Sequence, residues 1–76
     1  MQLFELLRKL RKVIGDENNI PYYMVAWDKV LIRLATEKPR TKEEFLSVNG
    51  VGEKWYSNYG SKFLDLINLY LDKQIK

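Results

Sequence analysis

The chain has 76 residues, of which 46% are hydrophobic and 13% aromatic, and this composition predicts one folded domain rather than a disordered segment. It contains neither cysteine nor histidine, which excludes a disulfide framework and a thiolate metal site and removes the commonest general base. No apolar run approaches the roughly 20 residues that a membrane span requires, so we expect a cytoplasmic domain with no membrane contact. The net charge of +3 comes from residues 1–40, which hold eight Lys and Arg against five Asp and Glu. Such a charge suits either a solvated surface or an acidic partner.

A stripe of apolar residues at helical spacing predicts a first helix from about Gln2 to Asp16 or Glu17. The residues of this stripe are Leu3, Leu6, Leu7, Leu10, Val13 and Ile14. The basic residues on the opposite side of the helix are Arg8, Lys9 and Lys12. Arg11 lies beside the stripe, near Phe4, and we expect its side chain to be partly structural.

The segment after this helix is predicted to be a loop anchored by a proline. Pro21 forces Ile20 into an extended conformation. Successive residues of an extended segment point in opposite directions, so we expect the ring of either Tyr22 or Tyr23 to join the core while the other faces solvent. Alternatively, both rings pack and their hydroxyl groups find backbone partners.

A second helix is predicted to begin at Asp28, which is a good N-cap residue, and to end before Pro39. Trp27 and Ile32 are placed to form a hydrophobic staple across this N-cap. The residues expected to face the interior are Val30, Leu31, Leu34 and Ala35. The basic residues on the outer face are Lys29 and Arg33.

Residues 41–44 are predicted to form a capping box, with Thr41 at the N-cap and Glu44 at N3, which opens a short helix through Phe45 and Leu46. A glycine turn at residues 50–52 separates it from the next helix. The aromatic residues of that helix are Trp55, Tyr56 and Tyr59.

Gly60 either caps this aromatic helix or lies inside one longer helix at a cost of about 1 kcal/mol. The residues that the last helix is expected to bury are Phe63, Leu64, Ile67, Tyr70 and Leu71. No stretch of four or more residues alternates convincingly between apolar and polar, so no sheet is expected. The predicted fold class is therefore all-α, a compact bundle of five short helices.

The glycine turn has two interpretations. Backbone amides near Gly50 and Gly52 and the start of the following helix could point toward a phosphate, with Lys54 assisting, as in the hairpin of helix-hairpin-helix motifs that bind DNA. Tyr56 stands where that motif usually has a small residue, which favours the second interpretation, a purely structural turn.

Several motifs follow one another in a specific order and spacing. They are Leu-Arg-x-Leu-Arg at residues 7–11, Ile-Pro-Tyr-Tyr at residues 20–23, Asp28 with Leu31 and Ala35, Pro39, and Ser-Val-Asn-Gly-Val-Gly at residues 47–52. This order resembles the HRDC (helicase and RNase D C-terminal) domain, in particular the version that ends bacterial RecQ DNA helicases. The resemblance extends from Leu3 to about Leu71. It implies a five-helix, SAM-like bundle that makes up residues 1–76 and is excised from the C-terminus of a longer helicase.

The same resemblance implies an auxiliary role in binding single-stranded or branched DNA, in a nucleoid-associated protein of DNA repair and recombination. The position of Tyr23 is the one that the family associates with base contact, and a stacked base is worth roughly 1–3 kcal/mol. Trp27, which the family seldom has at this position, could add a second stacking platform. The predicted DNA-binding residues are Tyr23, Arg8, Lys12, Arg11, Lys9, Trp27, Lys29, Arg33, Lys38, Lys54, Gly50 and Gly52. The alternative for the basic face is a solvated surface on which Glu5 pairs with Arg8 and Lys9.

No catalytic site is predicted. The acidic pairs at residues 16–17 and 43–44 are sequence neighbours, which do not face each other on a helix and cannot make a two-metal site. The domain is therefore expected to be non-catalytic and to need no cofactor or metal, with ATP and magnesium confined to the helicase core of the parent protein. We expect a monomer that binds single-stranded or junction DNA. The rival functions are a protein-interaction module that docks on its own helicase core or on a partner, and an RNA-binding accessory domain of an RNase D-like exonuclease.

Overall fold

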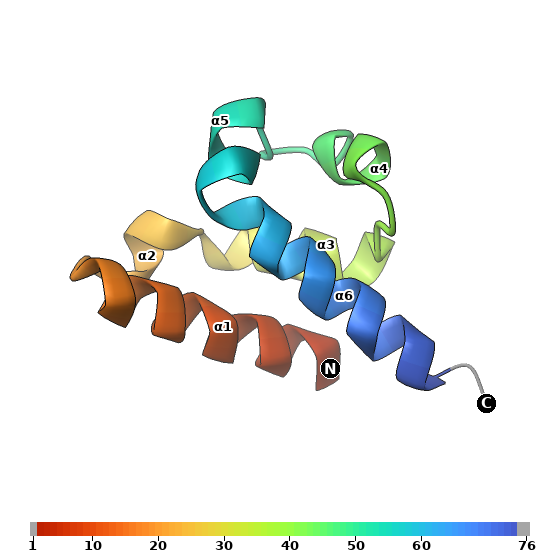
Figure 1. The fold of residues 1–76 in the computed structure, drawn as a ribbon, viewed down its shortest axis with the longest axis horizontal. Helices are drawn as coiled ribbons and strands as arrows, with labels where there is room; N and C mark the ends of the chain where they lie inside the picture. The colour runs from red at the N-terminus through yellow and green to blue at the C-terminus, as the bar shows by residue number, and fades with distance from the viewer. Residues whose placement is uncertain (1, 75–76) are drawn as a thin grey trace.

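A computed structural model describes residues 2–74 as a chain of helices (Figure 1). In order, the elements are α1 (Gln2–Asn18), α2 (Tyr22–Val25), α3 (Asp28–Glu37), α4 (Lys42–Leu46), α5 (Glu53–Trp55), η1 (Tyr56–Gly60) and α6 (Ser61–Gln74). Since α5, η1 and α6 follow one another without a break, residues 2–74 form five helical bodies and no strand. The predicted all-α, five-helix class is confirmed. None of these helices is long and apolar enough to cross a membrane.

The interior lies between α1, α3 and α6, with α4 and α5 above it in the view of Figure 1. α1 packs against α2, α3 and α6, and α4 packs against α6. The largest fully buried side chains are Leu3, Leu7, Ile14, Val25, Leu31, Leu34, Phe45, Phe63 and Ile67. Most of the predicted inward positions of α1, α3 and α6 are thus confirmed, although Val13 is half exposed.

The second helical body was not predicted. Tyr22–Val25 forms the short helix α2, with Pro21 in an extended conformation at its N-cap, where the sequence suggested a loop. Because the chain turns as a helix, Tyr22 and Tyr23 do not alternate between core and solvent. Both rings are more than half exposed, and Val25 enters the core in their place. The expectations that one or both tyrosines pack inside are therefore wrong.

The N-cap of α3 lies one residue earlier in the sequence than predicted. The N-cap is Trp27, and Asp28 is the first helical residue, whose carboxylate accepts a hydrogen bond from Arg11 instead of capping the helix. The predicted staple is also wrong, because this shift moves its two positions to Ala26 and Leu31, which are both buried. Trp27 and Ile32 are left largely exposed.

The ends of α3 and α4 follow the sequence signals. α3 stops at Lys38, which takes the left-handed conformation with φ 50°, just before Pro39. The capping box of α4 is confirmed, because the Glu44 N–H donates to Thr41 Oγ1 at 3.1 Å and the Thr41 N–H donates to Glu44 Oε1 at 3.4 Å.

Gly60 lies inside one continuous helix from Glu53 to Gln74, where the backbone widens locally into the π-helical turn η1. A Cβ added to Gly60 would come within 3.0 Å of both Phe45 Cε1 and Trp55 Cζ3. Glycine suits this position, because a larger residue would force the rings of Phe45 and Trp55 to shift.

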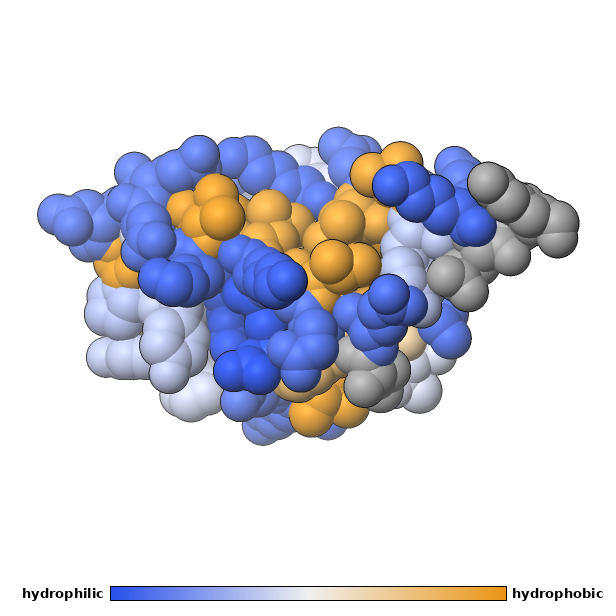
Figure 2. All heavy atoms as spheres, turned by 90° about the horizontal axis from the view of Figure 1, so that it is seen from below, coloured by the Kyte–Doolittle hydropathy of each residue, from blue (hydrophilic) through white to orange (hydrophobic). Residues whose placement is uncertain are grey.

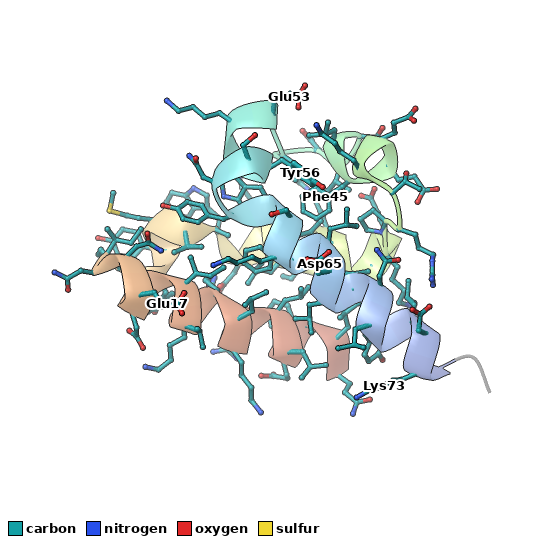
Figure 3. All side chains as sticks on the ribbon, viewed as in Figure 1. Glu17, Phe45, Glu53, Tyr56, Asp65 and Lys73 are labelled. Atoms are coloured by element: carbon teal, nitrogen blue, oxygen red, sulfur yellow. The ribbon has the colours of Figure 1, made fainter. Side chains whose placement is uncertain are left out.

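Those rings form what we call the interior aromatic stack, made of Phe45, Trp55 and Phe63. The Trp55 ring lies between the other two, with centroid distances of 6.0 and 5.6 Å and interplanar angles of 12° and 18°. Its Nε1 donates a 2.6 Å hydrogen bond to the carbonyl oxygen of Val25, which ties the stack to α2. Tyr56 meets Phe45 edge-on at 5.4 Å (Figure 3), so α4 and η1 are joined by ring contacts.

Candidate nucleic-acid interface

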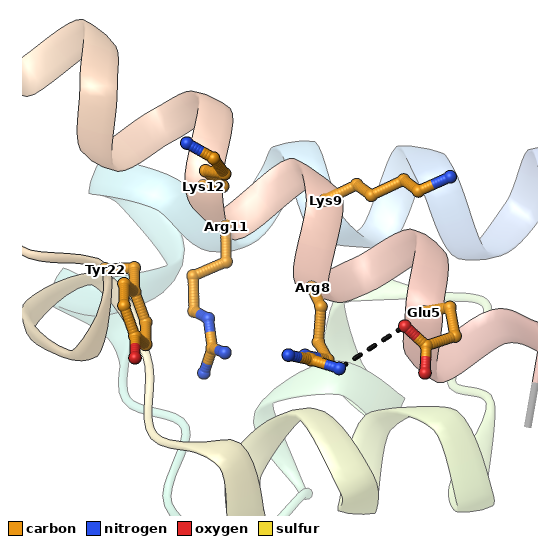
Figure 4. Close-up of a pocket in the computed structure, with 6 residues that line it drawn as sticks. All are labelled: Glu5, Arg8, Lys9, Arg11, Lys12 and Tyr22. Carbon is orange, nitrogen blue, oxygen red and sulfur yellow. Dashed lines mark hydrogen bonds and ion pairs between the residues drawn. The ribbon is translucent and has the colours of Figure 1, made fainter.

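One face of α1 carries a basic groove of about 320 Å³ (Figure 4). The residues that line this basic groove are Glu5, Arg8, Lys9, Arg11 and Lys12 of α1 and Tyr22 of α2. Figure 2, which views the molecule from the α1 side, shows hydrophilic side chains gathered around an apolar band. Four cationic side chains and one carboxylate line the groove, and two further carboxylates, Asp16 and Asp28, pair with Lys12 and Arg11. The remaining excess of positive charge favours an anion.

The cations of the groove are only weakly held by acidic neighbours. Arg8 Nη1 lies 3.4 Å from Glu5 Oε1, and Lys12 Nζ lies 3.6 Å from Asp16 Oδ2, in pairs whose side chains are all at least half exposed. Lys9 has no carboxylate within 4.0 Å among residues 2–74. Exposed pairs of this kind contribute about 0–1 kcal/mol, so a phosphate can compete for these side chains at little cost.

Arg11 differs from its neighbours because it is 4% exposed. Its Nη1 donates hydrogen bonds to Asp28 Oδ1 at 2.6 Å and to the Ala26 carbonyl oxygen at 3.1 Å. Its guanidinium carbon also lies 4.8 Å from the centre of the Tyr22 ring, a cation–π contact. The expectation that Arg11 is partly structural is confirmed: Arg11 fixes α1 to the junction of α2 and α3 and holds Tyr22 at the end of the groove.

Next to the groove is a surface aromatic cluster, formed by Tyr22, Tyr23 and Trp27. The Tyr22 and Tyr23 centroids are 6.3 Å apart in an edge-on arrangement, and the Tyr23 and Trp27 centroids are 6.5 Å apart with the rings tilted by 43°. The three side chains are 56%, 53% and 63% exposed, and neighbouring Met24 is 61% exposed. Such exposed ring faces can stack on nucleic-acid bases, whatever their sequence.

The glycine turn lies beside this cluster. Gly50 shares a cavity with Tyr23 and Trp27, and its φ of +96° favours glycine. Arg33 Nη1 donates a 3.2 Å hydrogen bond to the carbonyl oxygen of Asn49, which places a cation on the turn.

The other predicted site residues do not all lie near the surface aromatic cluster. Lys29 is exposed on α3. Gly52 ends the turn as the N-cap of α5, and Lys54 is exposed on α5. Lys38 lines a different hollow with Pro39 and Arg40, so the fold does not bring it to the surface aromatic cluster. Tyr22 and Met24 were not proposed as site residues, because a four-residue helix is too short to leave a periodic signal.

Within residues 2–74, no group of three or more His, Cys, Asp and Glu side chains is arranged to hold a metal ion.

The model of the HRDC domain family matches residues 1–67. The chain belongs to the HRDC domain family. A solved structure described as "D. radiodurans RecQ HRDC domain 3" has a TM-score of 0.86 and 40% sequence identity to this HRDC domain, covering 92% of each chain. The predicted resemblance to the HRDC domain of bacterial RecQ helicases is confirmed.

Two full-length relatives give the context in which similar HRDC domains occur. The ATP-dependent DNA helicase RecQ of Pasteurella multocida is 43% identical over 65 residues, which are 86% of this chain and 10% of the helicase. That of Bacillus subtilis is 39% identical over 69 residues, which are 91% of this chain and 12% of the helicase. The chain thus spans about a tenth of the length of these relatives.

Proposed function

We propose that this HRDC domain is an auxiliary, non-catalytic module of a RecQ-type ATP-dependent DNA helicase and that it binds single-stranded or branched DNA. The observation that carries the proposal is the juxtaposition of the basic groove with the surface aromatic cluster, which meet at Tyr22. Phosphates and bases of one strand need these two kinds of surface side by side. The ATP and magnesium chemistry would then belong to another domain of the same cytoplasmic protein.

The two parts of the surface would have separate tasks. Arg8, Lys9 and Lys12 would contact phosphates, which gives affinity and salt dependence without sequence preference. Tyr23 would stack on a base, with a gain of roughly 1–3 kcal/mol that any base can supply. Arg11 is left out of the phosphate contacts because its guanidinium is already committed to Asp28.

The test is fluorescence anisotropy of a labelled oligo-dT titrated with the domain over a salt series. Contacts with about three or four phosphates of a single strand should give a slope of log affinity against log salt of roughly −2 to −3. The variant Arg8→Ala/Lys12→Ala should bind more weakly and flatten this slope by about 1.4, because two phosphate contacts are lost. The matched control is Lys62→Ala/Lys73→Ala, which removes the same charge from α6 and should leave more of the affinity.

Stacking is tested separately from charge. Tyr23→Ala should weaken binding by about 1–3 kcal/mol at every salt concentration, whereas Tyr23→Phe, which keeps the ring, should bind nearly as the parent does. If neither the double variant nor Tyr23→Ala changed the affinity, this surface would not be the DNA-binding site.

A second candidate function is docking on another protein, and the exposure of Met24 beside three exposed rings favours it, since contiguous apolar surface often marks a protein interface. Absence of oligo-dT binding at low salt, together with cross-linking of the domain to a helicase core, would move this candidate ahead. RNA binding is distinguished by comparing oligo-rU with oligo-dU, which differ only in the 2′-hydroxyl, because tighter binding of the RNA then requires a contact with that group.

A further inference from the structure

A cavity of about 240 Å³ lies behind the surface aromatic cluster, between α2, the start of α3 and the glycine turn. Exposed Tyr23, Met24 and Trp27 line its outer part, and the buried Val25, Ala26 and Val30 form an apolar floor. Gly50 and the half-buried Trp55 complete the lining. This base cavity, as we call it, is separate from the basic groove, which Tyr22 closes on the other side of the cluster. Its volume equals that of roughly eight water molecules, which is room for one planar heterocycle.

The lining of the base cavity suits a flat aromatic group. Trp27 offers a side chain that is 63% exposed, whereas Trp55, which also lines the cavity, is half-buried in the interior aromatic stack. The floor has apolar side chains, so an occupant must present an apolar face to it and keep its polar edges toward solvent. A nucleobase of a single strand has this form.

The charges around the base cavity are positive. Arg33 sits on the glycine turn through its hydrogen bond to Asn49, and Lys29 and Lys54 lie next to the cavity residues in sequence. Among residues 2–74 none of these three cations has a carboxylate within 4.0 Å. The two acidic residues adjacent to them in sequence pair with other cations, Asp28 with Arg11 at 2.6 Å and Glu53 with Lys42 at 3.6 Å. An apolar cavity with a cationic rim complements a base attached to a phosphodiester backbone.

Gly50 keeps the base cavity open on the side of the turn. A Cβ added there would lie 3.2 Å from Val30 Cγ2 and 3.6 Å from Arg33 Nη1, between the floor and the cationic rim. The cavity is also continuous with the interface already described, because Tyr23 belongs both to the surface aromatic cluster and to the cavity wall.

We propose that the base cavity takes one nucleobase of a bound single strand, with Trp27 as its stacking face, while the phosphates on either side meet the basic groove and the cations of the glycine turn. This inference rests on the proposed function and adds to it a second base position on the far side of Tyr23. The strand would therefore cross the aromatic cluster instead of ending on it.

The experiment uses the fact that the chain has only two tryptophans. Tryptophan emission is recorded during titration with an oligo-dT, and the anisotropy of the same labelled oligonucleotide is recorded in parallel, for the parent and for Trp27→Phe. The difference between the two emission curves is the response of Trp27. We expect quenching of Trp27 that follows the anisotropy curve, and a loss of affinity of about fivefold or more in Trp27→Ala that Trp27→Phe largely restores.

Two competitors identify what occupies the base cavity. An abasic oligonucleotide of the same length keeps the phosphates and lacks the bases, so it should bind more weakly and leave Trp27 emission unchanged. An acidic peptide of matched charge tests for a protein occupant, and we expect it to quench Trp27 much less than oligo-dT does.

The outcomes separate the two proposals. Binding by anisotropy without a Trp27 response, or with equal affinity in Trp27→Ala, would overturn the base cavity and leave DNA binding intact. Equal quenching by the abasic strand or by the acidic peptide would overturn a nucleobase as the occupant. No binding of oligo-dT at low salt would overturn the proposed function and this inference with it.

Discussion

The molecule contains two groups of three aromatic rings that differ in almost everything except the distance between rings. In the interior aromatic stack the centroids are 5.6 and 6.0 Å apart and the rings are nearly parallel. In the surface aromatic cluster they are 6.3 and 6.5 Å apart, but the rings are edge-on or tilted and more than half exposed. Contact between rings therefore says little about their role, and exposure decides whether they stabilise the fold or remain free to bind.

The difference originates in a single short helix. The buried residue of α2 is Val25, whose carbonyl oxygen receives the Trp55 N–H, so α2 is anchored to the interior stack by its backbone. The tyrosines of α2 are not needed for this anchoring. We therefore expect changes of Tyr23 to have little effect on stability, as suits a binding surface, whereas Tyr22 also packs on the Arg11 guanidinium.

The largest expected difference is between the two tryptophans. Trp55→Ala should cost about 3–5 kcal/mol, because it removes the middle ring of the stack and leaves a cavity. That loss is comparable to the whole stability of a domain of this size, roughly 3–5 kcal/mol. Trp27→Ala should change the free energy of unfolding by less than about 0.5 kcal/mol. Urea denaturation followed by circular dichroism measures both, and a large loss in Trp27→Ala would mean that the surface cluster belongs to the core.

A smaller difference is expected between two cations of α1. Arg11→Ala should cost about 1.5–3 kcal/mol, because it removes charged hydrogen bonds to Asp28 and to the backbone and frees Tyr22. Lys12→Ala, one residue away, loses only an exposed pair with Asp16 and should cost at most about 0.5 kcal/mol. Thermal unfolding of the two variants provides the comparison. Equal costs would show that burial of Arg11 contributes nothing to joining α1 to the surface cluster.

The smallest difference is expected within the glycine turn. Gly50→Ala should cost about 1–2 kcal/mol, because its φ of +96° lies where a Cβ is strained. Gly52→Ser should be neutral or slightly stabilising, because its space is open and serine is a better N-cap than glycine. Chemical denaturation of both variants tests this, and a similar loss in each would mean that the strain is not local to Gly50.

The capping box predicted the five-residue α4. Helical periodicity was enough to predict α1, α3 and α6 and most of their buried positions, because each presents several apolar residues on one side. It could not predict α2, which has only four residues. The hydrogen bond from Arg11 to Asp28 joins residues 17 positions apart, so no local sequence pattern predicts it. The only local signal is that Arg11 lies beside the apolar stripe. Gly60 gave an ambiguous signal because glycine both ends helices and admits close packing, and here the packing of Phe45 and Trp55 decides.

The candidate site was predictable by residue type and less so by arrangement. The basic residues of α1 and Tyr23 could be named from the sequence. That Tyr22 closes the basic groove, and that Gly50 lies against Tyr23 and Trp27, depends on how α2 sits between α1 and the turn. Such long-range juxtaposition has no counterpart in local periodicity.

The π-helical turn η1 decides where this helix can lose a residue without disturbing the interior aromatic stack. Trp55 and Phe63 are eight residues apart, and in a regular α-helix their side chains would point about 80° away from each other. Because η1 takes up one extra residue, they face each other as residues seven apart would. Removing Ser57 or Asn58, both exposed, would convert the wide turn into an ordinary one and leave the rings in register. Removing one residue from α6 after Phe63 would rotate the rest of the helix out of phase. A one-residue deletion at η1 should therefore leave the buried side chains in place, whereas the same deletion in α6 should change which side chains are buried.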